Sequence, residues 1–161
     1  MVASRTHRGT GIMRSVVQRV QKAAVIVSGK RIAEIKQGIL VLLGIGRGDQ
    51  EEDVRYLVEK ITHLRIFEDE NGKMNLSLID IGGEMLVVSQ FTLLADCRTG
   101  RRPSFTEAEK PDRARLLCDC FVRMSRDKIA HVAQGEFQTT MSVELVNSGP
   151  VTMILDSKRL F

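Results

Sequence analysis

The chain has 161 residues and a formal net charge of +4, and 43% of its residues are hydrophobic. This length suits one compact domain whose core forms without disulfides or a structural metal. No apolar run approaches the roughly 20 residues of a bilayer-spanning helix, so we expect no membrane association. Lysines and arginines are interspersed with carboxylates, so the overall charge attracts phosphates only weakly.

The cysteines indicate a reducing environment. Cys97, Cys118 and Cys120 are odd in number, and the Cys-x-Cys spacing matches neither a zinc pair nor a Cys-x-x-Cys redox motif. We therefore expect an intracellular, cytoplasmic protein with free thiols. The sequence also has no His-Glu-x-x-His and no paired Cys-x-x-Cys, so we expect no metal and no cofactor.

Residues 1–12 differ from the rest of the chain. They are polar, include Arg5, His7 and Arg8, and have neither a strand nor a helix period. Two interpretations are open: an extension that precedes the fold, which we favour, or an organelle-targeting peptide, which should be longer and amphipathic. We expect a flexible leader over 1–12 and one domain over 13–161.

The next part of the chain has the pattern of β-strands. Residues 15–20 and 23–27 are β-branched runs, 28–30 is a turn, and 32–35 is a third extended piece, which together predict an antiparallel meander. Residues 38–45 are apolar on both faces and predict a central strand that is covered on both sides.

Two helices are predicted from apolar positions at intervals of three and four residues. The first follows Asp49 as its N-cap, with Glu52 at the capping-box position, and extends to Leu64. The second has Pro111 near its first turn and an apolar stripe that continues to Ile129.

Further strands surround these helices. Residues 65–67 are extended, 69–73 form a turn, 85–88 form an apolar strand, 141–145 alternate, and 151–155 form a last strand. We expect an α/β single domain with a mixed, largely antiparallel, barrel-like sheet and two helices packed on one side. Regular βαβ winding is disfavoured because the strands come in runs.

Side chains for acid–base chemistry are few. His7 lies in the leader, and His63 and His131 lie at helix ends, where we favour a surface position over a catalytic one. There is no Gly-x-Ser-x-Gly elbow. Taken alone, Thr92 is a capping or cross-strand residue more readily than a nucleophile, and Gly149-Pro150 is an ordinary turn.

A basic, turn-rich loop follows the strand 85–88. It contains Arg98, Arg101 and Arg102 and has no acid between Asp96 and Glu107. Two interpretations are open for it: solvated surface, or contact with nucleic-acid phosphates.

Taken together, five separate segments resemble the D-aminoacyl-tRNA deacylases in order and spacing. They are Met13–Val20, the Asn71-Gly72-Lys73-Met74-Asn75 turn, Ser89-Gln90-Phe91-Thr92-Leu93, Gly100-Arg101-Arg102-Pro103-Ser104-Phe105 and Asn147-Ser148-Gly149-Pro150-Val151-Thr152. The resemblance covers Met13 to about Asp156. It implies a homodimer with active sites at the interface, which hydrolyses the ester between a D-amino acid and the terminal adenosine of tRNA.

The resemblance also implies roles for individual residues. Ser89, Gln90, Phe91 and Thr92 would hold the substrate, with backbone amides near the scissile carbonyl. Thr92 matches the family's candidate nucleophile, but we prefer activation of water by the ribose 2′-hydroxyl of the substrate. An aminoacyl ester is already reactive, so positioning and oxyanion stabilisation can supply much of the acceleration.

Selection by chirality is assigned to main-chain atoms. The family's Gly-Pro pair, here Gly149-Pro150, is cis, enters the partner's pocket and leaves no space for an L side chain, so glycine should also be accepted. Arg19 matches a residue that holds this segment. Phe137 and Met141 match residues on the adenosine side of the pocket, although core packing explains them equally well.

One departure and two alternatives are also part of the prediction. Where the family usually has Gly-Ala after the phenylalanine, this chain has the bulkier Gln138-Thr139 beside the adenosine pocket. The main alternative function is a dimeric nucleic-acid-binding module without turnover, which would use the basic loop, and a third is a dimeric scaffold.

Overall fold

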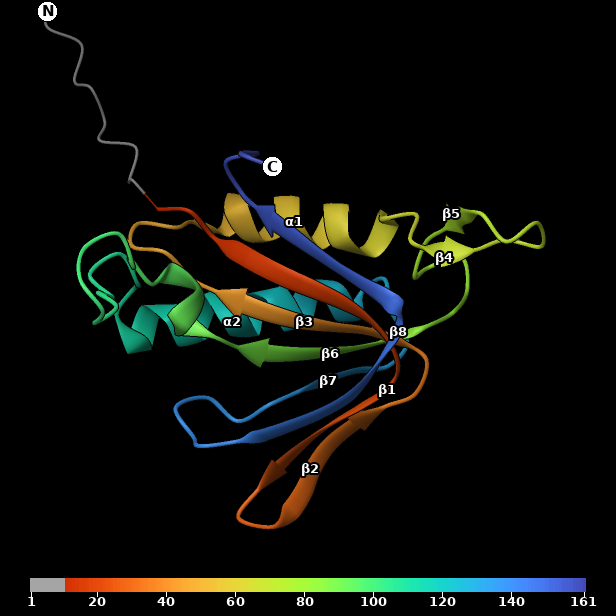
Figure 1. Cartoon of the computed structure of the whole chain (residues 1–161), viewed down its shortest axis with the longest axis horizontal. Coiled ribbons are helices and arrows are strands. Elements are labelled where there is room, and N and C mark those ends of the chain that lie inside the picture. The colour runs from red at the N-terminus through yellow and green to blue at the C-terminus, as the bar shows by residue number, and fades with distance from the viewer. Residues whose placement is uncertain (1–10) are drawn as a thin grey trace, which may run out of the picture.

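The long first strand organises the sheet. In the computed structural model, which describes residues 11–161, β1 (Arg14–Val27) pairs antiparallel with three other strands (Figure 1). These are β2 (Lys30–Ile35), β3 (Gly38–Gly44) and β8 (Ser142–Asp156). Because β2 and β3 pair with different halves of β1 while β8 follows nearly its whole length, the sheet curls as it passes β1.

Two predicted strand breaks are wrong. The runs 15–20 and 23–27 belong to the single strand β1, whose pairing with β8 shifts register between Gln18 and Lys22. Such irregularities bend a strand without ending it. The predicted strands 141–145 and 151–155 are likewise joined in β8, which begins at Ser142, because both parts pair with β1.

The middle of the sheet is parallel. Strand β6 (Glu84–Ser89) pairs parallel with β3, and β7 (Val132–Gln134) pairs parallel with β6. The crossovers contain α1 (Glu51–His63) and α2 (Pro111–Arg126). Two βαβ units are therefore present, and the expectation against βαβ winding is wrong for this half of the sheet. Strand β7 has only three residues, too few to produce a recognisable period.

The predicted fold class is confirmed. The path β2-β1-β3-β6-β7, with β8 on the other side of β1, makes a mixed, nearly closed sheet. Both helices pack on one side of it: residues of α1 and α2 share a core cluster with Ile39 and Val41 of β3. Leu40, which points the opposite way, belongs to a second cluster inside the curl. Strand β3 is therefore covered on both faces, as predicted.

The start of α1 differs from the prediction. Its N-cap is Gln50, whose backbone N–H donates to the Asp53 carboxylate at 2.8 Å. Asp49 is fully buried instead and accepts the Gly46 N–H at 2.6 Å. Pro111 does begin α2, but the helix ends at Arg126, and the predicted Ile129 is buried just beyond it.

The remaining described elements lie at the edges of the fold. Strands β4 (Phe67–Glu68) and β5 (Met74–Leu76) form a small separate hairpin.

Neither helix within residues 11–161 has the length and apolar character needed to cross a membrane. Gly11 is buried, and a methyl group on Gly46 would lie 2.7 Å from the Ile12 nitrogen, so the backbone is packed at least from Gly11. The nature of the leader itself stays a prediction, because residues 1–10 lie outside the described part.

Candidate functional site

A pocket of about 780 Å³ lies at the carboxyl end of β6. Three parts of the chain meet there: the residues that follow β6, the first turn of α2, and the loop between β7 and β8. Five predicted site residues line it, namely Ser89, Gln90, Phe91, Phe137 and Met141. The fold therefore joins segments that are about 50 residues apart in the sequence, as the substrate-binding prediction requires.

Backbone donors are available at the end of β6. The chain leaves the strand at Ser89 and forms a short 3₁₀ helix, η1 (Phe91–Leu94). The Gln90 N–H donates to Leu43 at 2.8 Å, and the Leu93 N–H donates to Gln90 at 3.1 Å. Phe91 and Thr92 begin the helical turn, so their N–H groups have no acceptor within it. Neither amide donates a hydrogen bond elsewhere within residues 11–161, so both are available to bind an oxygen.

Thr92 is placed beside the pocket without lining it. Its hydroxyl accepts a hydrogen bond from the Gln90 side-chain amide. Neither described histidine lies on the pocket wall: His63 contacts Glu59 at the end of α1, and His131 contacts the Glu34 carbonyl of β2 at 3.0 Å. His7 lies outside the described residues. Thr92 therefore has no histidine base among residues 11–161.

The acid on the pocket wall is Glu109, which the sequence analysis did not single out. Burial alone would raise the pKa of its carboxyl. The N–H groups of Gly48 and Lys110 and the positive charges of Arg113 and Arg47 outweigh burial and lower the pKa. A carboxylate with a low pKa that already accepts several hydrogen bonds is a weak proton acceptor, so Glu109 is placed to hold structure.

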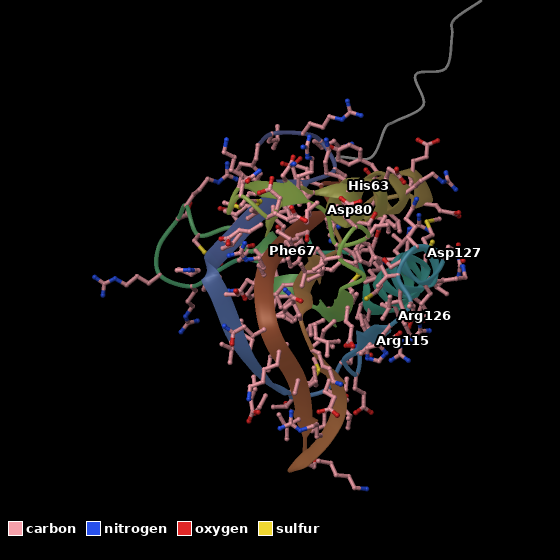
Figure 2. The ribbon with its side chains drawn as sticks, turned by 90° about the vertical axis from the view of Figure 1, so that its right-hand side faces the viewer. His63, Phe67, Asp80, Arg115, Arg126 and Asp127 are labelled. Atoms are coloured by element: carbon pink, nitrogen blue, oxygen red, sulfur yellow. The ribbon has the colours of Figure 1, made fainter. Side chains whose placement is uncertain are left out.

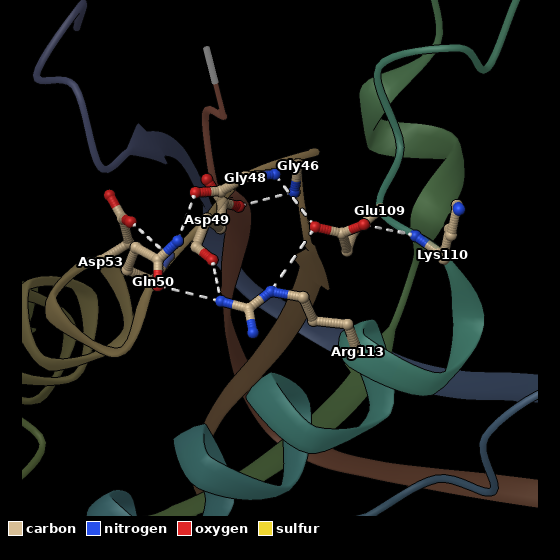
Figure 3. A network of polar contacts seen from close by, with 8 residues as sticks. All are labelled: Gly46, Gly48, Asp49, Gln50, Asp53, Glu109, Lys110 and Arg113. Atoms are coloured by element: carbon tan, nitrogen blue, oxygen red, sulfur yellow. Dashed lines mark hydrogen bonds and ion pairs between the residues drawn. The ribbon is translucent and has the colours of Figure 1, made fainter. Parts of the chain in front are cut away.

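Glu109 belongs to a polar network that joins the two helices (Figure 3). Its carboxylate accepts the Gly48 N–H at 3.0 Å and lies 3.7 Å from the Arg113 guanidinium. Arg113 also donates to the Asp49 carbonyl at 2.9 Å and to the Gln50 side chain at 3.0 Å. The network ties the first turn of α2, which lines the pocket, to the start of α1.

The buried carboxyl of Asp49 stands within this network. Burial raises its pKa to about 7, against the opposing effect of the Gly46 N–H. Its Oδ1 atom has no hydrogen-bond partner among residues 11–161. A protonated carboxyl is the form that such an environment favours.

The predicted basic loop is only partly available for binding. Arg98 donates to both carboxylate oxygens of Asp96, at 2.9 and 2.8 Å, and lowers the pKa of that carboxyl to about 2. Arg101 and Arg102 are exposed and have no ion pair within the described chain.

At the pocket mouth, Phe91 is 57% exposed and meets Phe105 edge to face, with ring centroids 5.1 Å apart.

The Gly149-Pro150 pair is not brought to this pocket. Its peptide bond is cis, and both residues are exposed in the middle of β8. Arg19 supports the segment: its guanidinium donates to the Ser148 carbonyl at 3.1 Å and to the Ile66 carbonyl at 2.8 Å. Arg19, the supporting residue of the prediction, therefore contacts the Gly-Pro segment and is itself 8% exposed.

Strand register separates the pair from the pocket. Gly149 and Pro150 lie between residues that pair with Val20 and Gln18, and Val20 pairs with Gly38, which pairs with Glu84 at the start of β6. The pocket lies at the opposite end of β6, about 17 Å away at the usual rise of a strand. Figure 1 shows the bend of β8 and the arrowhead of β6 at opposite ends of the sheet.

The departure at Gln138 has a structural counterpart. Gln138 lines the pocket with φ of +55°, in the left-handed region, which non-glycine residues adopt at a cost. The Thr139 hydroxyl donates to the Phe137 carbonyl at 3.3 Å and closes the turn.

No group of three or more potential metal ligands of the His, Cys, Asp and Glu types occurs among residues 11–161.

Comparison with known proteins shows what the chain is similar to. Residues 16–156 match the model of a family described as D-Tyr-tRNA(Tyr) deacylase. D-aminoacyl-tRNA deacylases from Syntrophus aciditrophicus (strain SB) and Thermosipho africanus (strain TCF52B) are 60% and 57% identical over 149 residues, covering 92% of this chain and all of each relative.

Two solved structures have the same fold. A protein titled c-Myc DNA Unwinding Element Binding Protein has a TM-score of 0.84 and 39% identity, and the match covers 88% of this chain and 97% of that one. A probable eukaryotic D-amino acid tRNA deacylase has a TM-score of 0.80 at 18% identity, covering 90% and 99%, which is similarity of fold alone.

Proposed function

The chain belongs to the D-aminoacyl-tRNA deacylase family and is an ester hydrolase that acts on aminoacyl-tRNA. We propose that it hydrolyses this ester with backbone groups of the pocket at the end of β6. The observation that carries this proposal is the meeting of Ser89, Gln90 and Phe91 with Phe137 and Met141 in that pocket. Small polar groups and free amides meet apolar walls there, which suits an ester attached to a nucleoside.

The free amides of Phe91 and Thr92 stabilise the developing oxyanion. They point from the start of η1, where no acceptor in the helical turn competes for them. The ribose 2′-hydroxyl of the substrate activates the attacking water. This assignment is supported by the pocket wall, which has no histidine among the residues that the structure describes, and by the carboxylate of Glu109, which already accepts hydrogen bonds from Gly48 and Lys110. Thr92 then positions Gln90 through their hydrogen bond.

Chirality is judged by Gly149-Pro150 of a partner subunit. Within one chain this pair lies near the end of β6 that is farther from the pocket. The pair is exposed, and Arg19 supports it by donating a hydrogen bond to the carbonyl of the preceding residue, Ser148. In a homodimer the pair of one subunit enters the pocket of the other. Its main-chain atoms occupy the volume of an L side chain, so D-aminoacyl and glycyl esters are cleaved and L-aminoacyl esters are rejected.

The terminal adenosine packs against Phe137 and Met141. These side chains are partly buried and form the apolar side of the pocket. Gln138 and Thr139 line the pocket beside them. Because these side chains are bulkier than the Gly-Ala that the family usually has here, the adenosine side of the pocket is narrower in this chain.

The decisive measurement is hydrolysis of matched D-tyrosyl-tRNA and L-tyrosyl-tRNA by the purified protein, with glycyl-tRNA as a third substrate. We expect cleavage of the D and glycyl esters and little cleavage of the L ester. Equal rates for the two tyrosyl esters would refute the selection by Gly149-Pro150.

A nucleic-acid-binding role without turnover is the second candidate. Two observations favour it: one similar structure is titled c-Myc DNA Unwinding Element Binding Protein, and Arg101 and Arg102 of the basic loop are exposed. Salt-dependent binding of tRNA without release of D-amino acid would support this candidate over the first.

A further inference from the structure

An arginine of α2 lies against the pocket wall without a role in the proposed chemistry. The guanidinium carbon of Arg115 is 5.0 Å from the centroid of the Phe137 ring, a cation–π distance. Phe137 lines the pocket, and so does Lys110, which lies five residues before Arg115. Figure 2 shows Arg115 on the α2 side of the molecule, on the same side as Arg126. One cation therefore contacts a pocket residue, and a second cation lies on the pocket wall.

Neither cation is neutralised within the described chain. The other arginines of α2 bind protein acceptors: Arg113 binds the Asp49 carbonyl, Arg123 the Cys120 thiol and Arg126 the Val132 carbonyl. Arg115 and Lys110 have no ion pair among residues 11–161, although Asp112 and Asp119 are three residues before and four residues after Arg115 on the same helix. An exposed guanidinium that is oriented by an aromatic ring and lacks a counter-charge is ready to bind an anion.

We propose that Arg115, assisted by Lys110, binds the phosphate that joins the last two nucleotides of the tRNA. This inference rests on the proposed function, because it requires the terminal adenosine to pack on Phe137. An adenosine that packs on Phe137 would bring its 5′-phosphate near this ring, and the Arg115 guanidinium, 5.0 Å from the ring centroid, is placed to bind it. Arg115 is a positioning residue: it holds the nucleotide while the ester lies at Ser89–Thr92.

The test compares two substrates. One is D-tyrosyl-tRNA, and the other is the D-tyrosyl ester of adenosine, which lacks the phosphate. Replacing Arg115→Gln should lower kcat/KM for the tRNA about three- to tenfold, through KM, and change the rate with the adenosine ester less than twofold. The slope of log kcat/KM against log salt should become shallower by about 0.7 for the tRNA, the value for one phosphate contact to a single strand.

Two further variants separate charge from packing. Arg115→Lys should recover most of the loss, because it retains the charge, and Lys110→Gln should give a smaller loss that is also confined to the tRNA. The matched control is Arg123→Gln, which removes the same charge from the same helix two turns away and should leave both substrates unaffected.

Three results would overturn the inference. They are equal losses on both substrates, which would mean that Arg115 acts only by supporting Phe137, an unchanged salt slope, and equal effects of Arg123→Gln. Failure of the proposed function is distinguishable, because the unaltered protein would then hydrolyse neither substrate.

Discussion

At the scale of single residues, the site is notable for how little its side chains contribute to proton transfer. Thr92 illustrates this: its hydroxyl is engaged by Gln90, and no described histidine shares its surroundings. A hydroxyl without a base is a poor nucleophile near neutral pH. The backbone around it, in contrast, offers donors in fixed positions.

We predict that Thr92→Ala retains deacylase activity within about threefold of the unaltered protein, because the hydroxyl only orients Gln90. The measurement is kcat/KM for D-tyrosyl-tRNA, with a thermal melt to show that the variant is folded. A loss of several orders of magnitude in a folded variant that still binds tRNA would restore Thr92 as the nucleophile.

We predict that Gly149→Ala lowers kcat/KM at least tenfold. The added methyl group would lie 2.7 Å from Arg19 Nη2 and 2.9 Å from Val151 Cγ2, at a φ of +120°, which L residues rarely adopt. The control is Gly72→Ala, which also has a positive φ of +73° but meets nothing within 4 Å. If both variants are as active as the unaltered protein, the Gly-Pro segment does not form part of the site.

At the scale of elements, the joint between the two helices sets the pocket wall. Arg113 and Glu109 connect the first turn of α2 to the turn before α1, and Asp49 is buried between them. The carboxylates of the joint are little exposed, 0% for Asp49 and 9% for the Glu109 side chain, although the Arg113 side chain is 45% exposed. The strength of the joint therefore depends on the charge of these carboxylates.

This joint predicts a dependence of stability on pH. The pKa of Asp49 is about 7 in the folded chain and near 3.8 when the group is exposed, so between these values the folded state binds more protons than the unfolded state. The contribution of Asp49 to the free energy of unfolding therefore falls as pH rises from about 4 to 7, and is constant above that range.

The variant Asp49→Asn tests this dependence, because it cannot ionise. The free energy of unfolding of the variant minus that of the unaltered protein, measured in urea, should be larger at pH 8 than at pH 4 by roughly 1–4 kcal/mol, because only the unaltered protein loses stability as Asp49 ionises. Asp119→Asn, at an exposed position on α2, is the control. The same difference at both pH values would show that Asp49 does not ionise in this range.

At the scale of the whole molecule, the pocket and the Gly-Pro segment lie at opposite ends of the sheet, and the proposed homodimer is the arrangement that would bring them together. Strand β8 has 15 residues and pairs with β1 only within the described part. Val146 and Ile154 on it are 38% and 56% exposed. A long edge strand with exposed apolar residues favours association.

Complementation between two impaired variants tests this arrangement. One variant is Gly149→Ala, and the other is Thr139→Trp, which fills the pocket with a large side chain. In a mixed dimer, the intact pocket of the first subunit faces the intact Gly-Pro pair of the second, so co-expression should restore about a quarter of the activity, for half mixed dimers with one good site each. Activity no higher than that of the separate variants would show that each chain forms its own site.

The sequence by itself determined the local elements and the family. The helical periods of α1 and α2 and the two-sided apolar run of β3 report local burial, and they were predicted correctly. The five family segments are read directly from residue order, so the deacylase assignment also came from sequence. The three-residue strand β7 was missed because it contains too few residues to show a period.

Only the tertiary structure decided which distant residues meet. It buried Asp49, which the local pattern assigned to a helix cap, and it placed Arg115 over Phe137, two residues that no motif connects. It also separated Gly149 from the pocket within one chain. Periodicity records which face of an element is covered, whereas these contacts depend on how elements far apart in sequence pack together, and no local pattern contains that information.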